Sequence, residues 1–376
     1  MPVVELSQNR SSTEPIPYVS ERLPATMKAA VYVGDSRIEV QCVPTPAIGP
    51  GEVLIRVESC GVCHTDLKKI EYNLLAPPRI FGHETAGVVA ATGKDVKKFA
   101  VGDRVTVFHH IPCGDCFYCA RRLYAQCPVY KKVGVTAGFE AAGGGFAQYV
   151  RVMDWIVERG MEPIPQGVSF DQACWVEPVN TCFKGVELLR IQSGDTVAVL
   201  GQGPIGLIFT LLAKRAGAQV FATDTIEHRL SMARRFGARP FDARQTDLEE
   251  SVKAATEGRG ADAVILATNA RGLVEQALLI SRPGAKILLF AQTSAKERIE
   301  CSGADICVGE RVLFGSYSAD MDLQGESARL VFSGELPVEE LVSHRFPLTR
   351  INEGIAVAQN PTAESLKVVI RPQEQT

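Results

Sequence analysis

The sequence predicts an α/β protein made of a β-rich domain and a doubly wound parallel sheet. Two patterns carry this prediction. Residues 27–176 have the pattern of many short strands separated by glycines, whereas from about Glu177 onward apolar strands alternate with helices. The chain has 376 residues, which is enough for two domains of ordinary size.

The first region has the period-two pattern of half-buried strands. Val53, Ile55 and Val57 alternate with polar residues, as in a strand that buries one face. Further short strands are expected at 85–91 and 103–109, separated by glycine turns. Together these segments favour a barrel-like or partly open β domain.

The second region has the pattern of a parallel sheet covered by helices on both faces. Helices are expected at 204–216 and 225–236. Apolar strands are expected at 196–200, 219–223, 263–267, 286–290 and 311–315.

These patterns divide the chain into three parts. Residues 1–26 are polar and contain several prolines, so we expect an N-terminal extension there. The parallel-sheet domain is expected to span 178–312. The chain ends in an expected strand at 367–370, and we assign 313–376 together with 27–177 to the β-rich domain.

The composition excludes several classes of partner. The net charge of −3 gives no indication of nucleic acid or an anionic membrane. No apolar run is long enough to span a bilayer. The N-terminus lacks the basic, apolar and small-residue order of a secretory signal. We therefore expect a cytoplasmic location, in which the eleven cysteines are thiols or thiolate ligands rather than disulfides.

A glycine motif indicates a dinucleotide site. Gly201, Gly203 and Gly206, with Pro204 and Ile205 between them, form GxGxxG where an expected strand meets an expected helix. Such glycines permit a tight turn, approach of a pyrophosphate and close packing of helix on strand, and the helix N-terminus favours phosphate. The motif alone is weak, and a plain tight turn is the alternative.

An acidic residue in the right place strengthens the cofactor prediction. Asp224 ends the next expected strand, about twenty residues after the motif. A carboxylate there accepts hydrogen bonds from ribose hydroxyls and repels a 2′-phosphate, which favours NAD over NADP. Arg229 follows in the next helix, where it either packs near the adenosine end of the cofactor or is a solvated helix arginine.

Four cysteines lie in one short segment: Cys113, Cys116, Cys119 and Cys127. Gaps of two, two and seven residues leave no sensible disulfide partners, but they suit a closed tetrahedral zinc site. An iron–sulfur cluster or reactive thiols are the alternatives. A closed zinc site stabilises a loop and leaves no ligand position for catalysis.

An open metal site would need three protein ligands and a free position. The candidates are Cys63 in a GVCHTD segment and His83 in a GHE segment. Spacing alone also allows His83 to be a polar core residue and Cys60 with Cys63 to be a redox pair.

These segments occur in a characteristic order: GVCHTD, GHE, VGDRV, the four cysteines and GQGPIG. From Met27 to its end, the chain resembles the zinc-dependent medium-chain alcohol/polyol dehydrogenase family, in its sorbitol/threonine dehydrogenase-like branch. The resemblance implies a GroES-like β-rich catalytic domain and a Rossmann cofactor domain. It also implies NAD and two zinc ions per chain, one catalytic and one structural.

The resemblance further assigns a catalytic zinc site. It makes Cys63 and His83 ligands of this zinc. Glu177, in a Glu-Pro element similar to that of sorbitol and threonine dehydrogenases, would be the third ligand, directly or through water. Glu84 would exchange onto the metal, and Asp66 would hold the ring of His83 from outside the ligand set.

The resemblance leaves alternatives open at further positions. Cys174 and Cys182 are the alternatives to Glu177 as third ligand. Thr65 matches a hydroxyl that passes the alcohol proton outward. Lys68 stands where many family members have a histidine, so either water completes the relay or Lys68 contacts an anionic group of cofactor or substrate.

The implied reaction is reversible hydride transfer between NAD and a secondary alcohol, namely a polyol, sugar or amino alcohol. A primary-alcohol dehydrogenase and a non-catalytic NAD-binding relative are the alternatives. The resemblance also implies a small-molecule partner and a homo-oligomer, more often a tetramer than a dimer. The motifs do not fix which alcohol is the substrate.

Overall fold

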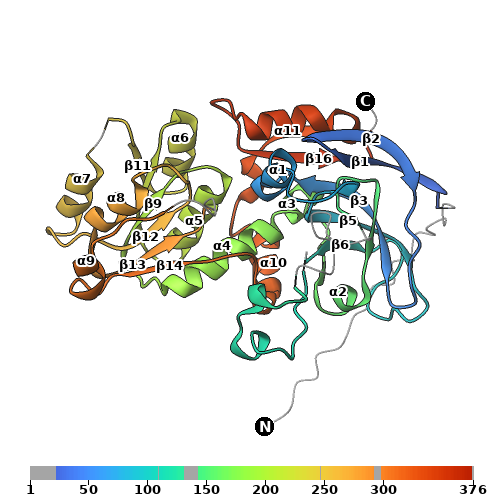
Figure 1. Cartoon of the computed structure of the whole chain (residues 1–376), viewed down its shortest axis with the longest axis horizontal. Coiled ribbons are helices and arrows are strands. Elements are labelled where there is room, and N and C mark those ends of the chain that lie inside the picture. Colours follow the sequence, from blue (N-terminus) through green and yellow to red (C-terminus); the bar gives the residue numbers. More distant parts are fainter. Residues whose placement is uncertain (1–22, 109, 131–142, 246, 292–297, 375–376) are drawn as a thin grey trace, which may run out of the picture.

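The computed structural model describes residues 23–108, 110–130, 143–245, 247–291 and 298–374. Of the expected N-terminal extension, residues 1–22 lie outside the described residues. The described chain forms two halves, one built on two sheets and the other on a single sheet, and helix α4 (Val176–Leu189) lies between them in Figure 1.

The half on the right of Figure 1 is β-rich, as predicted. Its larger sheet contains, in spatial order, β15 (Val342–Pro347), β16 (Lys367–Arg371), β3 (Val53–Gly61), β5 (Glu84–Thr92), β6 (Arg104–Val107) and β8 (Met161–Pro163), with β7 (Tyr149–Val152) paired to β3. Its smaller sheet contains β2 (Arg37–Pro44), β1 (Thr26–Gly34) and β4 (Arg79–Ile80). Most neighbouring strands in this half are antiparallel.

Strand β3 is longer and more buried than the alternating pattern predicted. Val53, Leu54 and Ile55 are all buried, whereas Arg56 and Glu58 stay partly exposed. Because successive side chains of a strand point to opposite faces, this consecutive burial means that both faces of β3 are covered at this end. A strand covered on both faces loses the alternation of a half-buried strand.

The end of the chain returns to the β-rich half. Strand β16 pairs antiparallel with β3, with Val369 opposite Gly61 and Ile370 opposite Cys60. The backbone N–H of Val62 donates to the carbonyl of Val368 at 2.9 Å. The first residues of β16 therefore lie beside the segment that leads to Cys63.

The other half has the doubly wound parallel sheet that the sequence predicted. Its strands, in spatial order, are β11 (Arg239–Asp242), β10 (Gln219–Asp224), β9 (Thr196–Leu200), β12 (Ala261–Leu266), β13 (Ser281–Leu289) and β14 (Val312–Gly315). All neighbouring strands are parallel. The chain enters at β9 in the middle of the sheet, so the loop after β9 lies at the topological switch point.

Alternate residues of β9 supply two separate cores. Val197 and Val199 pack with α4, α5 (Pro204–Arg215) and α6 (Glu227–Arg235). Ala198 and Leu200 pack with α7 (Leu248–Ala255) and α8 (Leu273–Ile280) on the other face. Helices therefore cover both faces, which explains why these strands are apolar throughout.

Two elements cross the domain boundaries expected from the sequence. Strand β14 pairs with β13 up to Gly315, so the parallel sheet extends beyond residue 312. Helix α4 begins at Val176, before the boundary expected at 178. The division of the remaining segments between the two domains stays a prediction.

The other helices of the described chain are α1 (His64–Glu71), α2 (Asp154–Arg159), α3 (Phe170–Ala173), α9 (Gly303–Cys307), α10 (Gln324–Phe332) and α11 (Ile351–Gln359). Helix α10 packs on α4. Among the described residues, we find no helix that combines the length and apolar character needed to cross a membrane.

Candidate metal centres and cofactor site

Three of the predicted site residues meet where β3 ends and β5 begins. Ligand atoms of Cys63, His83 and Glu84 all lie within 4.8 Å of one another. Cys63 caps helix α1, and its Sγ accepts the backbone N–H of Thr65 at 3.4 Å. Gly82 has φ +97°, and a side chain there would meet Cys60 and Phe146, so a glycine is needed to turn His83 toward Cys63.

Asp66 orients the ring of His83. The Nδ1 of His83 lies 3.1 Å from the Oδ1 of Asp66, and both side chains are buried. Burial alone would lower the pKa of His83, but the Asp66 carboxylate and the Cys63 sulfur raise it well above the ordinary value. This environment favours a positive charge on or beside the ring. Because Nδ1 is engaged by Asp66, Nε2 is the nitrogen left to bind a metal.

Glu177 lies near this group but is not a member of it. It occupies the first turn of α4 and is buried. Burial raises the pKa of Glu177 to about 7, with His83 opposing the rise and Glu84 adding to it. Its carboxyl is therefore close enough to interact electrostatically with both side chains. Its role as a metal ligand stays a prediction.

The two alternative cysteines do not join the group. Burial raises the pKa of Cys174 and Cys182 well above the ordinary value, which disfavours the thiolates that bind metals. Cys174 Sγ donates to the carbonyl of Asp171 at 3.2 Å, and Cys182 Sγ lies 3.9 Å from the carbonyl of Ile205.

A buried lysine next to the group was missed by the sequence reasoning. The Nζ of Lys367 donates to Oε1 of Glu84 at 2.6 Å and also pairs with Oε2. Burial would lower the pKa of Lys367, but the Glu84 carboxylate and the Cys63 sulfur raise it above the ordinary value. The lysine at the head of an otherwise apolar terminal strand was the signal that could have found it.

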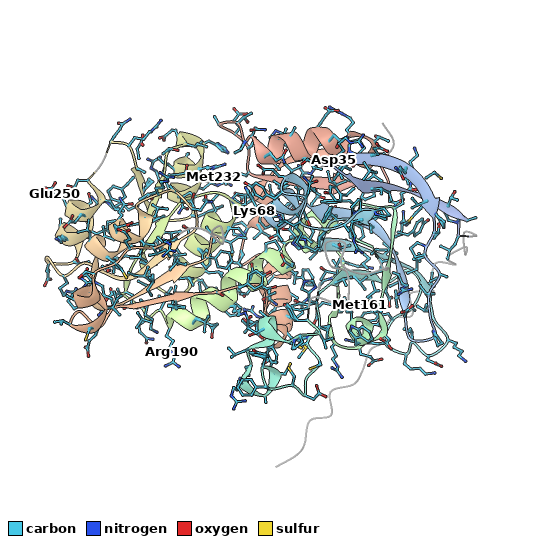
Figure 2. All side chains as sticks on the ribbon, in the orientation of Figure 1. Asp35, Lys68, Met161, Arg190, Met232 and Glu250 are labelled. Atoms are coloured by element: carbon cyan, nitrogen blue, oxygen red, sulfur yellow. The ribbon has the colours of Figure 1, made fainter. Side chains whose placement is uncertain are left out.

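Two further predicted residues lie on helix α1. Thr65 follows Cys63 by two positions and is half-buried. Lys68 is also half-buried, one turn later, and its label in Figure 2 stands where the two halves meet. Lys68 is therefore only partly exposed to solvent.

The four-cysteine segment forms a closed cluster. The Sγ–Sγ distances are 3.5 Å for Cys116–Cys119, 3.6 Å for Cys127–Cys113 and 3.9 Å for Cys113–Cys119. Disulfides would need about 2.05 Å. A tetrahedron with zinc–sulfur bonds of about 2.3 Å has edges of about 3.8 Å, so the four sulfurs fit a zinc ion.

The charge state of one cysteine also suits a metal. Burial raises the pKa of Cys127, but the backbone N–H groups of Cys113 and Val129 and the other thiols bring it down to about 7. A thiolate is the form that binds metals. The segment is attached to the rest of the chain by a 2.9 Å hydrogen bond from the Tyr124 hydroxyl to Oδ2 of Asp322.

The glycine loop has the shape that the motif predicted. Gly201, with φ +94°, follows β9, and Gly203 caps α5. A Cβ on Gly206 would lie closer than 3.0 Å to the backbone of Gly201, whereas one on Gly203 would meet nothing within 4 Å. Helix and strand are thus in close contact, and there is open space beside Gly203, at the N-terminus of α5, that a pyrophosphate can occupy.

Asp224 ends β10 beside this loop. Its Oδ2 accepts the N–H of Gln202 at 2.7 Å, and its Oδ1 accepts the N–H groups of Thr225 and Ile226 at 2.8 and 3.0 Å. Arg229 Nη1 lies 3.8 Å from Asp224 Oδ2, and its side chain is 15% exposed. Arg229 is therefore not the solvated helix arginine considered above.

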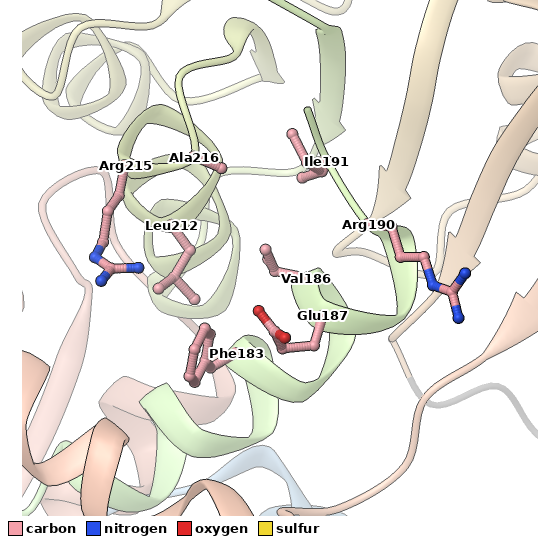
Figure 3. Close-up of a pocket in the computed structure, with 8 residues that line it drawn as sticks. All are labelled: Phe183, Val186, Glu187, Arg190, Ile191, Leu212, Arg215 and Ala216. Carbon is pink, nitrogen blue, oxygen red and sulfur yellow. The ribbon is translucent and has the colours of Figure 1, made fainter. Parts of the chain in front are cut away.

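Helix α4 joins the metal group to the glycine loop. Its first turn carries Glu177, and Cys182 further along contacts Ile205 at the start of α5. A separate pocket between α4 and α5 is lined by residues such as Phe183, Glu187 and Arg215 (Figure 3). None of the predicted site residues lines this pocket, so we do not assign the site to it.

Comparisons with known proteins cover nearly the whole chain. The families described as "Alcohol dehydrogenase GroES-like domain" and "Zinc-binding dehydrogenase" match residues 49–165 and 204–332. Sorbitol dehydrogenase of Bacillus subtilis is 29% identical over 361 residues, which are 94% of this chain and 99% of that protein. L-threonine 3-dehydrogenase of Pyrococcus furiosus is 32% identical over 339 residues, which are 87% of this chain and 92% of that protein.

A solved structure gives the same result. The zinc-binding dehydrogenase of Sinorhizobium meliloti 1021, bound to NADP, superposes with a TM-score of 0.84 at 29% identity. The match covers 93% of this chain and 100% of that chain.

Replacing Cys116 by serine should release the metal of the four-cysteine segment, because serine supplies no thiolate. We expect the zinc content to fall by about one ion per chain. We expect the Tm to fall by roughly 5 °C or more, since each kcal/mol shifts Tm by about 2–4 °C in domains of 150–250 residues. Elemental analysis and a thermal melt measure both, with exposed Cys42→Ser as the control. An unchanged zinc content would show that this segment binds no zinc.

Replacing Asp66 by asparagine should weaken metal binding at Cys63 and His83, because the neutral amide no longer supports the imidazole as a ligand. We expect the affinity to fall roughly 10- to 100-fold. Competition with a chromogenic chelator measures this affinity. Asp103→Asn is the control, because Asp103 lies outside the metal group, directly before β6, where it accepts the backbone N–H of Ala100. Equal affinities for the wild-type and Asp66→Asn proteins would contradict the orienting role.

Proposed function

Because the chain belongs to the zinc-dependent medium-chain alcohol/polyol dehydrogenase family, we propose that it transfers hydride between a secondary alcohol and NAD. The observation that carries this proposal is the meeting of Cys63, His83 and Glu84 next to a helix that contacts the glycine loop. When a metal group and a dinucleotide loop are linked by one helix in this way, they can bring an alcohol and a nicotinamide ring together.

The residues of the metal group fit zinc. A thiolate, an imidazole and a carboxylate are ligands that zinc takes in catalytic sites, where a fourth position stays open. Cys63, His83 and a carboxylate of Glu84 or Glu177 would hold the ion. When bound, zinc supplies Lewis acidity that lowers the pKa of an alcohol toward neutrality. With the four-cysteine segment, this site gives the proposed content of two zinc ions per chain.

The protein's own groups would manage the proton and the ring geometry. Asp66 fixes the orientation of His83 through Nδ1. The Thr65 hydroxyl, beside Cys63, would accept the proton of the substrate hydroxyl and donate its own outward, since a hydroxyl is both donor and acceptor. Half-buried Lys68 would contact an anionic group rather than act as the base, because an ordinary lysine is protonated near neutral pH.

NAD is favoured over NADP by the surroundings of Asp224. Its carboxylate ends β10 at the position where ribose hydroxyls are recognised in this fold. Arg229 already lies 3.8 Å from this carboxylate, so its charge is partly neutralised and it offers a poor partner for a 2′-phosphate. The NADP-bound relative shows that this fold can hold NADP, so the choice of cofactor rests on these side chains.

A secondary alcohol is favoured by the relatives. Sorbitol dehydrogenase and L-threonine 3-dehydrogenase, by their names, oxidise hydroxyl groups of a polyol and an amino acid. The Glu177 carboxylate at the site of this chain is consistent with the same class.

The proposal is tested by assaying a panel of sorbitol and other polyols, 2,3-butanediol, threonine and ethanol with NAD. We expect measurable NADH formation with at least one secondary alcohol and a lower kcat/KM for ethanol. Cys63→Ser should abolish this activity, whereas Cys42→Ser should leave it unchanged. Preference for ethanol would favour a primary-alcohol dehydrogenase, and no turnover of any alcohol by zinc-replete protein would favour a non-catalytic relative.

Replacing Asp224 by serine should shift the cofactor preference, because it removes the ribose acceptor and the charge that repels a 2′-phosphate. We expect the ratio of kcat/KM for NAD to that for NADP to fall by roughly tenfold or more, a change of about 1.4 kcal/mol. Asp242→Ser is a matched control, since Asp242 lies opposite Asp224 on β11. A wild-type enzyme that prefers NADP would contradict the assignment.

A further inference from the structure

We infer that Lys367 is a positioning residue that holds Glu84 away from the metal and thereby keeps one metal position open. This inference rests on the proposed zinc site at Cys63 and His83. It goes beyond that site because it assigns a role to a residue from the last strand of the chain, 283 positions away from Glu84.

A metal and Lys367 would compete for the carboxylate of Glu84. An oxygen of Glu84 lies within 4.8 Å of both the Cys63 sulfur and a His83 nitrogen, so Glu84 is within reach of a shared metal. Yet the ammonium of Lys367 engages both oxygens of the same carboxylate. Glu84 can coordinate the metal fully only by giving up this ion pair.

The ammonium of Lys367 is confined inside the protein. Lys367 and Glu84 are 6% and 2% exposed. The Nζ of Lys367 also lies 5.3 Å from the centroid of the buried Trp175 ring, which stabilises a cation by its negative face. The ammonium is thus held between a carboxylate and an indole, and breaking the ion pair inside the protein would leave an unpaired buried charge.

The absence of a side chain at Gly61 leaves room for the ion pair of Glu84 and Lys367. A Cβ there would lie closer than 3.0 Å to both Oε2 of Glu84 and Cε of Lys367. Gly61 is the last residue of β3 and precedes Cys63, the N-cap of α1, by two positions. The space above β3 is therefore filled by the ion pair itself, and this space is available because position 61 is glycine.

The charges of the groups around the metal also favour pairing of Glu84 with Lys367. A dication is neutralised by the Cys63 thiolate and one carboxylate, whereas Glu84 and Glu177 together would leave an excess negative charge in a buried site. The ammonium of Lys367 cancels the charge of Glu84. Glu84 then serves as a reserve ligand, and the position it would occupy stays available to water or substrate.

The test replaces Lys367 by methionine, which keeps the length and removes the charge. In Co²⁺-loaded protein we expect the visible d–d spectrum to change as Glu84 becomes a permanent ligand. We expect release of Co²⁺ to a chelator to slow roughly tenfold, as when a partner of a metal ligand is altered. Lys367→Arg should keep the wild-type spectrum and release rate, because it keeps the charge.

Further variants separate positioning from mere packing. Glu84→Gln/Lys367→Met should lose the slow release, because the freed carboxylate is gone. Lys286→Met is the control for loss of a lysine. Lys286 is a half-buried residue of β13 whose ammonium donates to the carbonyl of Leu189, at the end of α4. Unaltered Co²⁺ spectrum and release in Lys367→Met, or the same change in Lys367→Arg, would overturn the inference.

These measurements need neither alcohol nor NAD. If wild-type protein takes up no Co²⁺ at Cys63 and His83, the proposed zinc function itself fails. If wild-type uptake is normal and Lys367→Met behaves like wild type, the role of Lys367 alone fails.

Discussion

The concentration of acidic groups at one buried point is the constraint on which the rest of the molecule depends. Asp66, Glu84 and Glu177 lie around Cys63 and His83, where burial makes unbalanced charge costly. Lys367 neutralises one of the carboxylates, and His83 is placed where a positive charge is favoured. A metal dication on Nε2 would take the place of the proton on His83 and complete this balance, which suits the arrangement to a metal.

Distant parts of the chain are arranged to maintain this point. Strand β16 returns from the C-terminal end to lie beside β3 and delivers Lys367. The four-cysteine segment is hydrogen-bonded through Tyr124 to Asp322, and the neighbouring Asp320 exchanges two backbone–amide hydrogen bonds with Asn180 of α4. Asn180 lies one turn after Glu177. The cysteine segment therefore braces the helix that carries this carboxylate, although it stands outside the metal group.

Local patterns in the sequence predicted much of this architecture, whereas contacts between distant segments could not be predicted. The glycine loop, the four cysteines and the parallel sheet depend on spacing within short stretches, and the structure contains all three. The burial of β3 and the pairing of Lys367 with Glu84 depend on which strands become neighbours. Asp224 shows both cases: its place after β10 was predicted, but its bond to the N–H of Gln202 requires the folded loop.

We propose that the chain holds two different metal sites, of which the less conspicuous one, at Cys63 and His83, carries the chemistry. Anomalous diffraction from crystals of the purified protein at the zinc absorption edge tests this claim most directly. We expect two peaks per chain, one between Cys63 and His83 and one in the four-cysteine segment. A single peak within the four-cysteine segment, in crystals grown with excess zinc, would contradict it.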